Sequence, residues 1–442
     1  TLTLDVDGAP RPTRFAVLDA SGAGRADAEV VHVGWATREQ LADGGVAGRV
    51  ALVDRNPLYH RSTQYDNCVE AGAAALLFAS SAPENLPQVG SVRRTWEAIG
   101  PIPALTIGSV DAHALRDALL ARRPVRARVA VDAWVARGVG RNVIGRIAGA
   151  SDGELVVGAH YDSWFAGSCD NGSGVAAMLA LAERRARRPR PRYGLTFVAW
   201  DGEELALYGG YHQLRRYAAA GTRPLAVIDF ETPSANGAQA YGLARSNHAP
   251  LEDAIIDVGL HELFALNVPM DLVAELFGGV IPTDIQGLYR AGTPAVATAV
   301  DAPYYHTEGD TPDKVDLARL EEMVLGFDRA LDRLLTVAPE RFGVRDPALW
   351  QAAVEVDVRG EDLVVSVVVR DVAGRAQADA VVDGVLFDDD FFERQSVRVK
   401  SDAAGAARLV FAGGARRPDD PPRFVHVAAG ARWPLVEAVR AV

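Results

Sequence analysis

The middle of this sequence alternates short apolar runs with amphipathic stretches, and that rhythm restricts the possible fold more than any other feature. The apolar runs predict buried strands, and the stretches between them have the spacing of helices. Strands joined through helices need crossover connections, which predict a parallel or mixed sheet. The expected strands are Leu155–Ala159, Leu195–Trp200, Leu225–Phe230 and Ala295–Val300, and the expected helices are Ser173–Arg188, Ala206–Ala219, Ala249–Glu262 and Leu317–Val337.

The parts on either side of this region are richer in strand patterns, so we expect three domains at residues 1–137, 138–340 and 345–442. The first has short apolar runs between Gly- and Pro-rich turns, and the last alternates with almost no helical pattern, which favours a small β-sandwich. The fold class expected is α/β, with a mixed, mostly parallel sheet flanked by helices and β-rich domains before and after it. The expected flanking elements are the strands Val50–Val53, Ala75–Phe78, Ala104–Ile107, Ala353–Val358, Leu363–Val369, Ser396–Val399 and Ala407–Phe411 and the helical patches Cys68–Ala73 and Asp111–Ala121.

Composition excludes several classes of protein. The 442 residues are enough for about three domains, at roughly 150 residues each. A net charge of −12 argues against nucleic acid as the main partner. Two cysteines rule out a disulfide scaffold and a cysteine-based zinc ribbon, and the absence of a run of ~18 apolar residues argues against a membrane span. The arginine-rich stretch from Arg184 to Arg192 is interpreted as cations at a helix C-terminus rather than a phosphate or nucleic-acid site.

Polar side chains follow the ends of the predicted strands of the middle region. The loops at the carboxyl ends of strands in an open α/β sheet meet in one crevice, so residues far apart in the sequence can share a site. The residues at these ends are His160-Tyr161-Asp162, Asp170-Asn171-Gly172-Ser173-Gly174, Asp201-Gly202-Glu203-Glu204, Asp229 and Tyr304-Tyr305-His306-Thr307.

These histidines and carboxylates form a donor set that suits zinc, or manganese or cobalt in its place. The carboxylates Asp170, Glu204 and Asp229 would balance much of the charge of two divalent cations and would be costly to bury without them. Two such cations lower the pKa of a shared water and polarise a carbonyl group, while a free glutamate carries the proton to the leaving amine. Each motif alone also fits a structural role: a satisfied His–Asp pair, a solvated Glu-Glu helix start, or a turn that caps a helix.

Taken together and in this order, the motifs resemble the signature of the co-catalytic dizinc exopeptidases of clan MH. That group includes aminopeptidase Y, the bacterial leucyl aminopeptidases and glutamate carboxypeptidase. The resemblance implies that His160 and Asp229 bind one zinc ion, that Glu204 and His306 bind the other, and that Asp170 bridges the two. It therefore predicts two Zn²⁺ per chain.

The resemblance also implies roles for residues around these ligands. Glu203 would be the general base and acid, and Asp162 would orient the histidine that precedes it by two residues. Tyr305 would contact the scissile carbonyl, and Asp284 would support His306. The peptide bond after the bridging aspartate is expected to be cis.

The first part of the sequence resembles a protease-associated domain, a module that often accompanies these peptidases and helps to cover their cleft. This resemblance rests on Val46–Val53, Ala71-Gly72-Ala73 and Ile102–Ile107. In the last part, Asp388-Asp389-Asp390 could suggest calcium, but we interpret it as an exposed acidic loop.

The expected activity is that of a metal-dependent exopeptidase acting on peptides or small aminoacyl substrates, with release of N-terminal residues as the leading hypothesis. Three alternatives stay open. A glutamate-type carboxypeptidase would bind the substrate carboxylate with an arginine such as Arg93 or Arg94. A glutaminyl-peptide cyclase would use one zinc ion, and a receptor-like module would bind without catalysis. The oligomeric state is unknown, and location follows the family only, which suggests a secreted or cell-envelope protein.

Overall fold

A seven-stranded mixed sheet forms the centre of the molecule in the computed structural model. Its strands run in the order β14-β13-β15-β12-β10-β11-β9. The pairs within β11-β10-β12-β15 are parallel, whereas β9 and β13 pair antiparallel to their neighbours β11 and β15. The bounds are β9 Val143–Ile147, β10 Glu154–His160, β11 Gly194–Trp200, β12 Ala226–Asp229, β13 Tyr241–Arg245, β14 Leu266–Pro269 and β15 Ala295–Val300. The predicted mixed, mostly parallel sheet is confirmed.

The structure describes residues 1–441 except 56–60, 93–98, 137, 221, 239, 247, 271–272, 274–280, 344–350, 372, 388–392, 417–423 and 431–435. The candidate arginines Arg93 and Arg94 and the acidic stretch Asp388–Asp390 lie outside the described residues. No helix among the described residues is long and apolar enough to cross a membrane.

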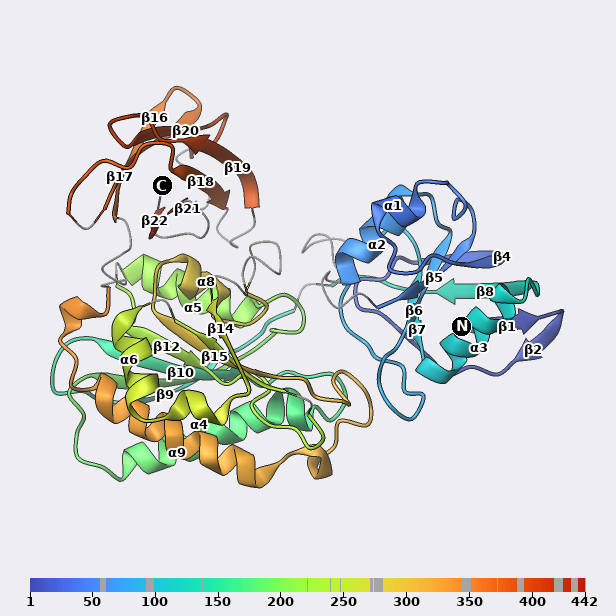
Figure 1. Cartoon of the computed structure of the whole chain (residues 1–442), viewed down its shortest axis with the longest axis horizontal. Coiled ribbons are helices and arrows are strands. Elements are labelled where there is room, and N and C mark those ends of the chain that lie inside the picture. Colours follow the sequence, from blue (N-terminus) through green and yellow to red (C-terminus); the bar gives the residue numbers. More distant parts are fainter. Residues whose placement is uncertain are drawn as a thin grey trace.

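Helices cover both faces of the central sheet (Figure 1). Alternate residues of β10 supply the two cores: Leu155 and Val157 pack in one apolar cluster, and Val156 packs in the other. Burial on both faces explains why these strands read as continuous apolar runs. One cluster includes α4 (Gly174–Ala186), α6 (Ala249–Asp257) and α9 (Leu317–Leu334), and the other includes α5 (Tyr208–Ala220) and α8 (Gln286–Arg290).

The central sheet differs from the sequence-based expectation at its margins. The strands β9 and β14 are edge strands with partly exposed side chains, and β13 has one buried residue, Leu243. Such strands show no continuous apolar run, so periodicity did not reveal them. The helix expected over Ala249–Glu262 stops at Asp257 because Gly259 adopts a left-handed φ of 68° before a short 3₁₀ turn.

Residues 1–136, which we call the N-terminal domain, form an eight-stranded sheet in the order β2-β1-β8-β4-β5-β6-β7-β3. The three strands expected from the sequence are present as β5, β6 and β7 and run parallel side by side. The helical patch expected at Cys68–Ala73 is instead the end of a longer helix. The bounds are β1 Leu2–Val6, β2 Ala9–Arg11, β3 Phe15–Val17, β4 Gly24–His32, β5 Val50–Asp54, β6 Ala75–Ala79, β7 Ala104–Ile107, β8 Val125–Val131, α1 Arg38–Leu41, α2 Arg61–Glu70 and α3 Ser109–Leu120.

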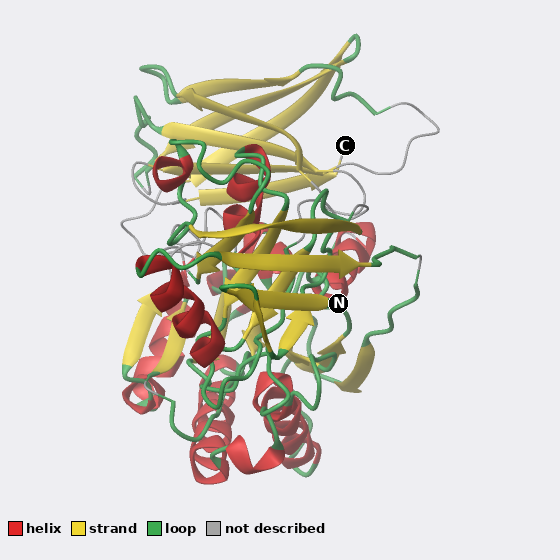
Figure 2. Cartoon of the chain, turned by 90° about the vertical axis from the view of Figure 1, so that its right-hand side faces the viewer, coloured by secondary structure: helices red, strands yellow, loops and turns green. Residues whose placement is uncertain are grey.

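The C-terminal part of the chain consists of two antiparallel sheets, β16-β17-β20 and β19-β18-β21-β22, which share one apolar core (Figure 2). Buried residues from both sheets, such as Val365 and Val382, alternate with exposed ones, as expected for a β-sandwich. The bounds are β16 Gln351–Arg359, β17 Asp362–Arg370, β18 Val381–Phe387, β19 Glu393–Lys400, β20 Ala406–Phe411, β21 Phe424–Gly430 and β22 Val436–Ala441.

The arginine-rich end of α4 is a structural feature of the middle domain. Arg185 and Asp328 are both buried, and the arginine Nε lies 2.7 Å from a carboxylate oxygen of Asp328. Arg184 and Arg188 also pair with Asp328, and Arg188 reaches the half-exposed Asp332 at 2.8 Å. These ion pairs join α4 to α9, which supports the structural interpretation of the stretch.

This network predicts unequal effects for its two aspartates. Asp328→Ala would remove the buried carboxylate that pairs with the buried Arg185, which would keep only the half-exposed Asp332, and should lower the free energy of unfolding by about 3 kcal/mol. Asp332→Ala removes a half-exposed carboxylate that pairs with Arg185 and Arg188, but leaves Arg185 its buried partner Asp328, and should cost about 1 kcal/mol or less. Urea unfolding of both variants measures the difference. Equal losses would contradict the assignment of Asp328 as the central carboxylate.

Candidate metal centre

Two groups of potential metal ligands meet where strands of the central sheet end, and Asp170 belongs to both. His160, Asp170 and Glu231 form the first group, and Asp170, Glu204 and His306 form the second. Within each group, one donor atom from every residue lies within 4.8 Å of the others. A carboxylate shared by two donor groups is the arrangement expected of a bridging ligand between two metal ions.

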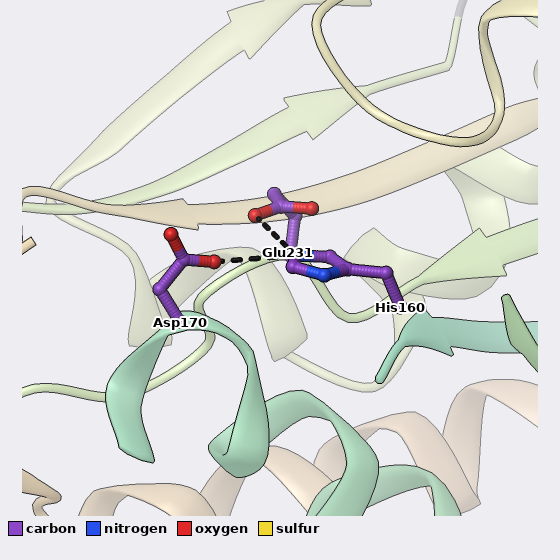
Figure 3. Close-up of side chains that lie close together, drawn as sticks. All are labelled: His160, Asp170 and Glu231. Carbon is purple, nitrogen blue, oxygen red and sulfur yellow. Dashed lines mark hydrogen bonds and ion pairs between the residues drawn. The ribbon is translucent and has the colours of Figure 1, made fainter. Parts of the chain in front are cut away.

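His160 ends β10 and is buried, with its ring directed at two carboxylates (Figure 3). Its Nε2 lies 3.2 Å from Oδ1 of Asp170 and 3.6 Å from Oε1 of Glu231. Its Nδ1 donates to the main-chain oxygen of Asp162 at 2.9 Å, so in the neutral ring the lone pair of Nε2 faces the carboxylates. A proton or a metal cation must therefore lie between these groups.

The second group is assembled from three separate loops. Nε2 of His306 lies 3.0 Å from Oδ2 of Asp170 and 3.1 Å from Oε2 of Glu204. The indole of Trp164 donates to the same Oε2 of Glu204 at 2.7 Å, which orients that carboxylate. Nδ1 of His306 donates to the main-chain oxygen of Val89, a residue of the N-terminal domain, at 3.2 Å.

Asp170 lies in the loop that leads into α4. The backbone N–H groups of Cys169 and Asp170 donate to the carboxylate of Asp310 at 2.8 and 3.1 Å. The peptide bond between Asp170 and Asn171 is cis, as expected from the sequence. Cys169 is buried beside this loop, which agrees with a packing role.

Asp229, predicted as a metal ligand, belongs to neither donor group found among the described residues, whereas Glu231 belongs to the first. In the parallel pairing of β10 with β12, Asp229 is level with Gly158, two residues before His160. Side chains on one face of a strand recur every second residue, so this register, continued by two residues beyond the end of β12, would place Glu231 level with His160. Asp229 instead accepts a hydrogen bond from Thr283, and burial raises its pKa to about 8.

Asp162 connects two of the loops that form the site. Its carboxylate accepts the backbone N–H groups of Glu203 and Glu204 at 3.1 and 3.2 Å, and Oδ1 lies 3.6 Å from Nδ1 of His160. The direct hydrogen bond to that histidine comes from the main-chain oxygen of Asp162 rather than from its carboxylate. Asp162 therefore has a role beyond the expected one of orienting His160, because its carboxylate also holds the Glu203–Glu204 turn.

Asp284 does not support His306 in the structure. It accepts the backbone N–H of Gly210 at 2.9 Å, and the charges that act on it come from His160, Asp229 and Asp162. The ring of His306 is held instead by Val89. The sequence contained no signal for this contact, since the two residues belong to different domains.

Tyr305 stacks on the neighbouring ring of His306, with ring centroids 3.6 Å apart. Burial raises the pKa of its hydroxyl well above the ordinary value, and the charges of Asp170 and Glu204 raise it further. The phenol is thus neutral at ordinary pH, and it lies close enough to Asp170 and Glu204 for their charges to act on it.

The electrostatics of the site reflect crowded carboxylates. Burial raises the pKa of Glu203 well above its usual range, and the charges of Glu231 and Glu204 add to this effect. Burial also raises the pKa of Asp170, but hydrogen bonds from His160 and His306 outweigh it and hold that pKa well below its ordinary value. Several acidic groups held this close together favour bound cations.

The residues present fit zinc. Buried side-chain atoms without a hydrogen-bond partner among the described residues include Oε1 of Glu204, Oδ1 of Asp229, Oε2 of Glu231 and Nε2 of His306. Buried polar atoms normally have a hydrogen-bond partner. Unpartnered nitrogen and oxygen atoms in both donor groups therefore indicate that a bound cation is missing. Imidazole and carboxylate donors are typical of zinc.

Comparison with known proteins identifies the family of the part of the chain that contains these donor residues. Residues 142–327 match the family model of peptidase family M28. This segment belongs to that family. A glutamate carboxypeptidase 2 homolog from Caenorhabditis briggsae is 38% identical over 76 residues, which are 16% of this chain and 10% of that protein. A probable leucine aminopeptidase from Arthroderma otae is 26% identical over 211 residues, which are 42% of this chain and 55% of that protein.

Most of the chain also shares its fold with solved structures. A zinc aminopeptidase from Bacillus subtilis aligns with a TM-score of 0.56 and 19% identity, over 75% of this chain and 80% of that one. This likeness concerns the fold. The chain spans between about a tenth and about half of the length of the two curated relatives named above.

Proposed function

We propose that this chain is a metal-dependent exopeptidase whose M28 domain binds two zinc ions. The observation that carries the proposal is the sharing of Asp170 between two donor groups, with His160 and Glu231 on one side and Glu204 and His306 on the other. Membership of the M28 family supports a peptidase activity. Manganese or cobalt would be accepted by the same nitrogen and oxygen donors.

The geometry suggests how this chain would divide the work of peptide hydrolysis. Two bound divalent cations would supply a water of lowered pKa and a polarised substrate carbonyl. Glu203 is outside both donor groups, yet the charges of His160, Glu231 and Glu204 act on its carboxyl group. It would accept the proton of the attacking water and pass it to the leaving amine. The hydroxyl of Tyr305 would donate to the substrate carbonyl oxygen.

Two arginines of the N-terminal domain favour a substrate with a free carboxylate. The guanidinium of Arg55 lies over the Tyr305 ring, 5.9 Å from its centroid, and donates to Gln88. Burial and the nearby charge of Arg61 lower the pKa of Arg55 to about 10. Within the described part of the chain, the charge of Asp301 acts on Arg55, and the buried Nε of Arg61 has no hydrogen-bond partner. An anionic substrate group would satisfy both.

Removal of a C-terminal residue, or cleavage of a dipeptide, is therefore the activity that we infer from the geometry. Release of N-terminal residues, the leading hypothesis from the sequence, is the second candidate. It is supported by the relatives named as aminopeptidases, one of which matches 42% of this chain. The two candidates differ in which end of the substrate must be charged.

A substrate panel distinguishes them. Metal-free and zinc-reloaded protein would be assayed with N-acetylated dipeptides, aminoacyl anilides and peptides with N-terminal glutamine. We expect zinc-dependent hydrolysis of the N-acetylated dipeptides. Turnover of the anilides alone would establish the aminopeptidase, and cyclisation of glutamine peptides would establish a cyclase. Cleavage of none of them with zinc bound would favour a non-catalytic module.

The arginine pair gives a prediction of its own. Arg61→Ala should raise KM for N-acetylated dipeptides roughly tenfold to a hundredfold, because a hydrogen bond to a charged group contributes about 1.5–3 kcal/mol. Arg14→Ala, which removes an exposed ion pair between the same two domains, is the matched control. An unchanged KM in Arg61→Ala would contradict carboxylate binding at this position.

A further inference from the structure

One segment of the N-terminal domain, Glu84–Val89, runs along the loop of the M28 domain that contains His306. The hydroxyl of Tyr304 donates to Glu84 at 2.6 Å, and the side-chain amide of Gln88 donates to the main-chain oxygen of Tyr305 at 2.8 Å. Val89 then makes two hydrogen bonds with His306 itself. Its N–H donates to the main-chain oxygen at 3.0 Å, and its carbonyl accepts from the ring Nδ1 at 3.2 Å.

His306 needs such support more than the other histidine does. It lies outside helices and strands and adopts a left-handed φ of 59°, a conformation that residues other than glycine hold only when their surroundings impose it. The ring Nδ1 of His160 is held by Asp162, two residues away in the same loop. The partner of His306, Val89, lies 217 positions earlier in the chain.

The contact with Val89 fixes both the ring and its tautomer. A carbonyl oxygen accepts only, so Nδ1 must carry the proton and Nε2 is left to face Asp170 and Glu204. Gln88 and Val89 are almost fully buried, so water does not compete readily for these hydrogen bonds. The N-terminal domain thus provides the outer support of a proposed metal ligand, a kind of contact that strongly affects metal affinity.

We propose that Gln88 and Val89 are positioning residues of the metal centre, and that docking of the N-terminal domain determines how firmly the Asp170–Glu204–His306 group holds its metal. This inference rests on the proposed function, because it requires these side chains to bind zinc. The N-terminal domain then contributes directly to the geometry of the metal centre.

The test measures zinc release from the full chain. Gln88→Ala removes the hydrogen bond to Tyr305, and Gln88→Glu removes the same donor while keeping an acceptor for Arg55. Val89→Pro removes the N–H that binds the main chain of His306. Each loaded protein is mixed with a chromophoric zinc chelator. We expect one of the two zinc ions to leave about tenfold or more faster in these variants, as is typical when an outer partner of a metal ligand is lost.

Arg14→Ala is the control, since it removes an exposed contact between the same domains at Glu308 and should release zinc as the wild type does. The melting temperatures of the metal-free proteins show whether a variant still folds, and the two Gln88 variants decide the outcome if Val89→Pro does not. Wild-type release rates in the folded variants, or equal acceleration in Arg14→Ala, would overturn the inference. A wild-type chain that takes up no zinc would instead contradict the proposed function.

Discussion

Glu203→Gln should lower kcat for peptide hydrolysis by about a hundredfold to ten-thousandfold, the usual contribution of a general base. The amide keeps the size of the side chain but cannot accept the proton of the attacking water. The carboxyl group of Glu203 is surrounded by the charges of His160, Glu231 and Glu204, yet it belongs to neither donor group. The loss should therefore occur with zinc still bound, and with KM little changed.

The adjacent residue is the matched control for this variant. Glu204→Gln alters the carboxylate that faces Nε2 of His306 at 3.1 Å, so it should lose activity together with one zinc ion. Zinc content and initial rates, measured on the same preparations, separate the two effects. A Glu203→Gln protein with full zinc content and unchanged kcat would show that another group transfers the proton.

Glu231→Ala and Asp229→Asn should differ sharply, although the two residues are separated by one position. Glu231→Ala removes a member of the His160–Asp170–Glu231 group, and its loss of zinc affinity should exceed the roughly 10- to 100-fold typical of outer partners. Asp229→Asn should keep both zinc and activity. Asp229 lies outside both donor groups and accepts from Thr283, so an amide that keeps this acceptor is a close replacement.

Zinc affinity of the two variants, measured by competition with a chelator, checks this assignment. Melting temperatures of the metal-free proteins show that both remain folded. Loss of zinc in Asp229→Asn with retention in Glu231→Ala would restore Asp229 as the ligand, as first expected from the sequence.

Much of this fold was readable from the sequence where strands are buried on both faces. The strands β10, β11, β12 and β15 were expected because their apolar runs are continuous, and they form the inner part of the sheet. The edge strands β9 and β14 were missed because partial exposure leaves no such run. The α4–α9 ion pairs were anticipated only as charges at a helix end, since their partners lie in a distant helix.

Some donor residues of the site could be predicted from the sequence, and others could not. His160, Asp170, Glu204 and His306 follow strand ends or loops with distinctive motifs, and the structure brings them together. The choice between Asp229 and Glu231 depended on the register between β10 and β12, which a strand pattern does not contain.

Contacts between domains were also beyond sequence reasoning. Val89 and the Arg55–Arg61 pair reach the site only because the N-terminal domain docks against the loop of His306. Their own sequence neighbourhood carries no metal or substrate motif. The substrate preference that we propose from the arginines therefore depends on the docked structure, and release of N-terminal residues stays the second candidate.

The most direct test of the central claim is the zinc content of the purified full chain after loading with excess zinc and dialysis against metal-free buffer. Elemental analysis against protein concentration gives the ratio. We predict two zinc ions per chain, one for each donor group that shares Asp170. A ratio of one would indicate a single-metal site, and a ratio of zero would contradict a metal-dependent peptidase.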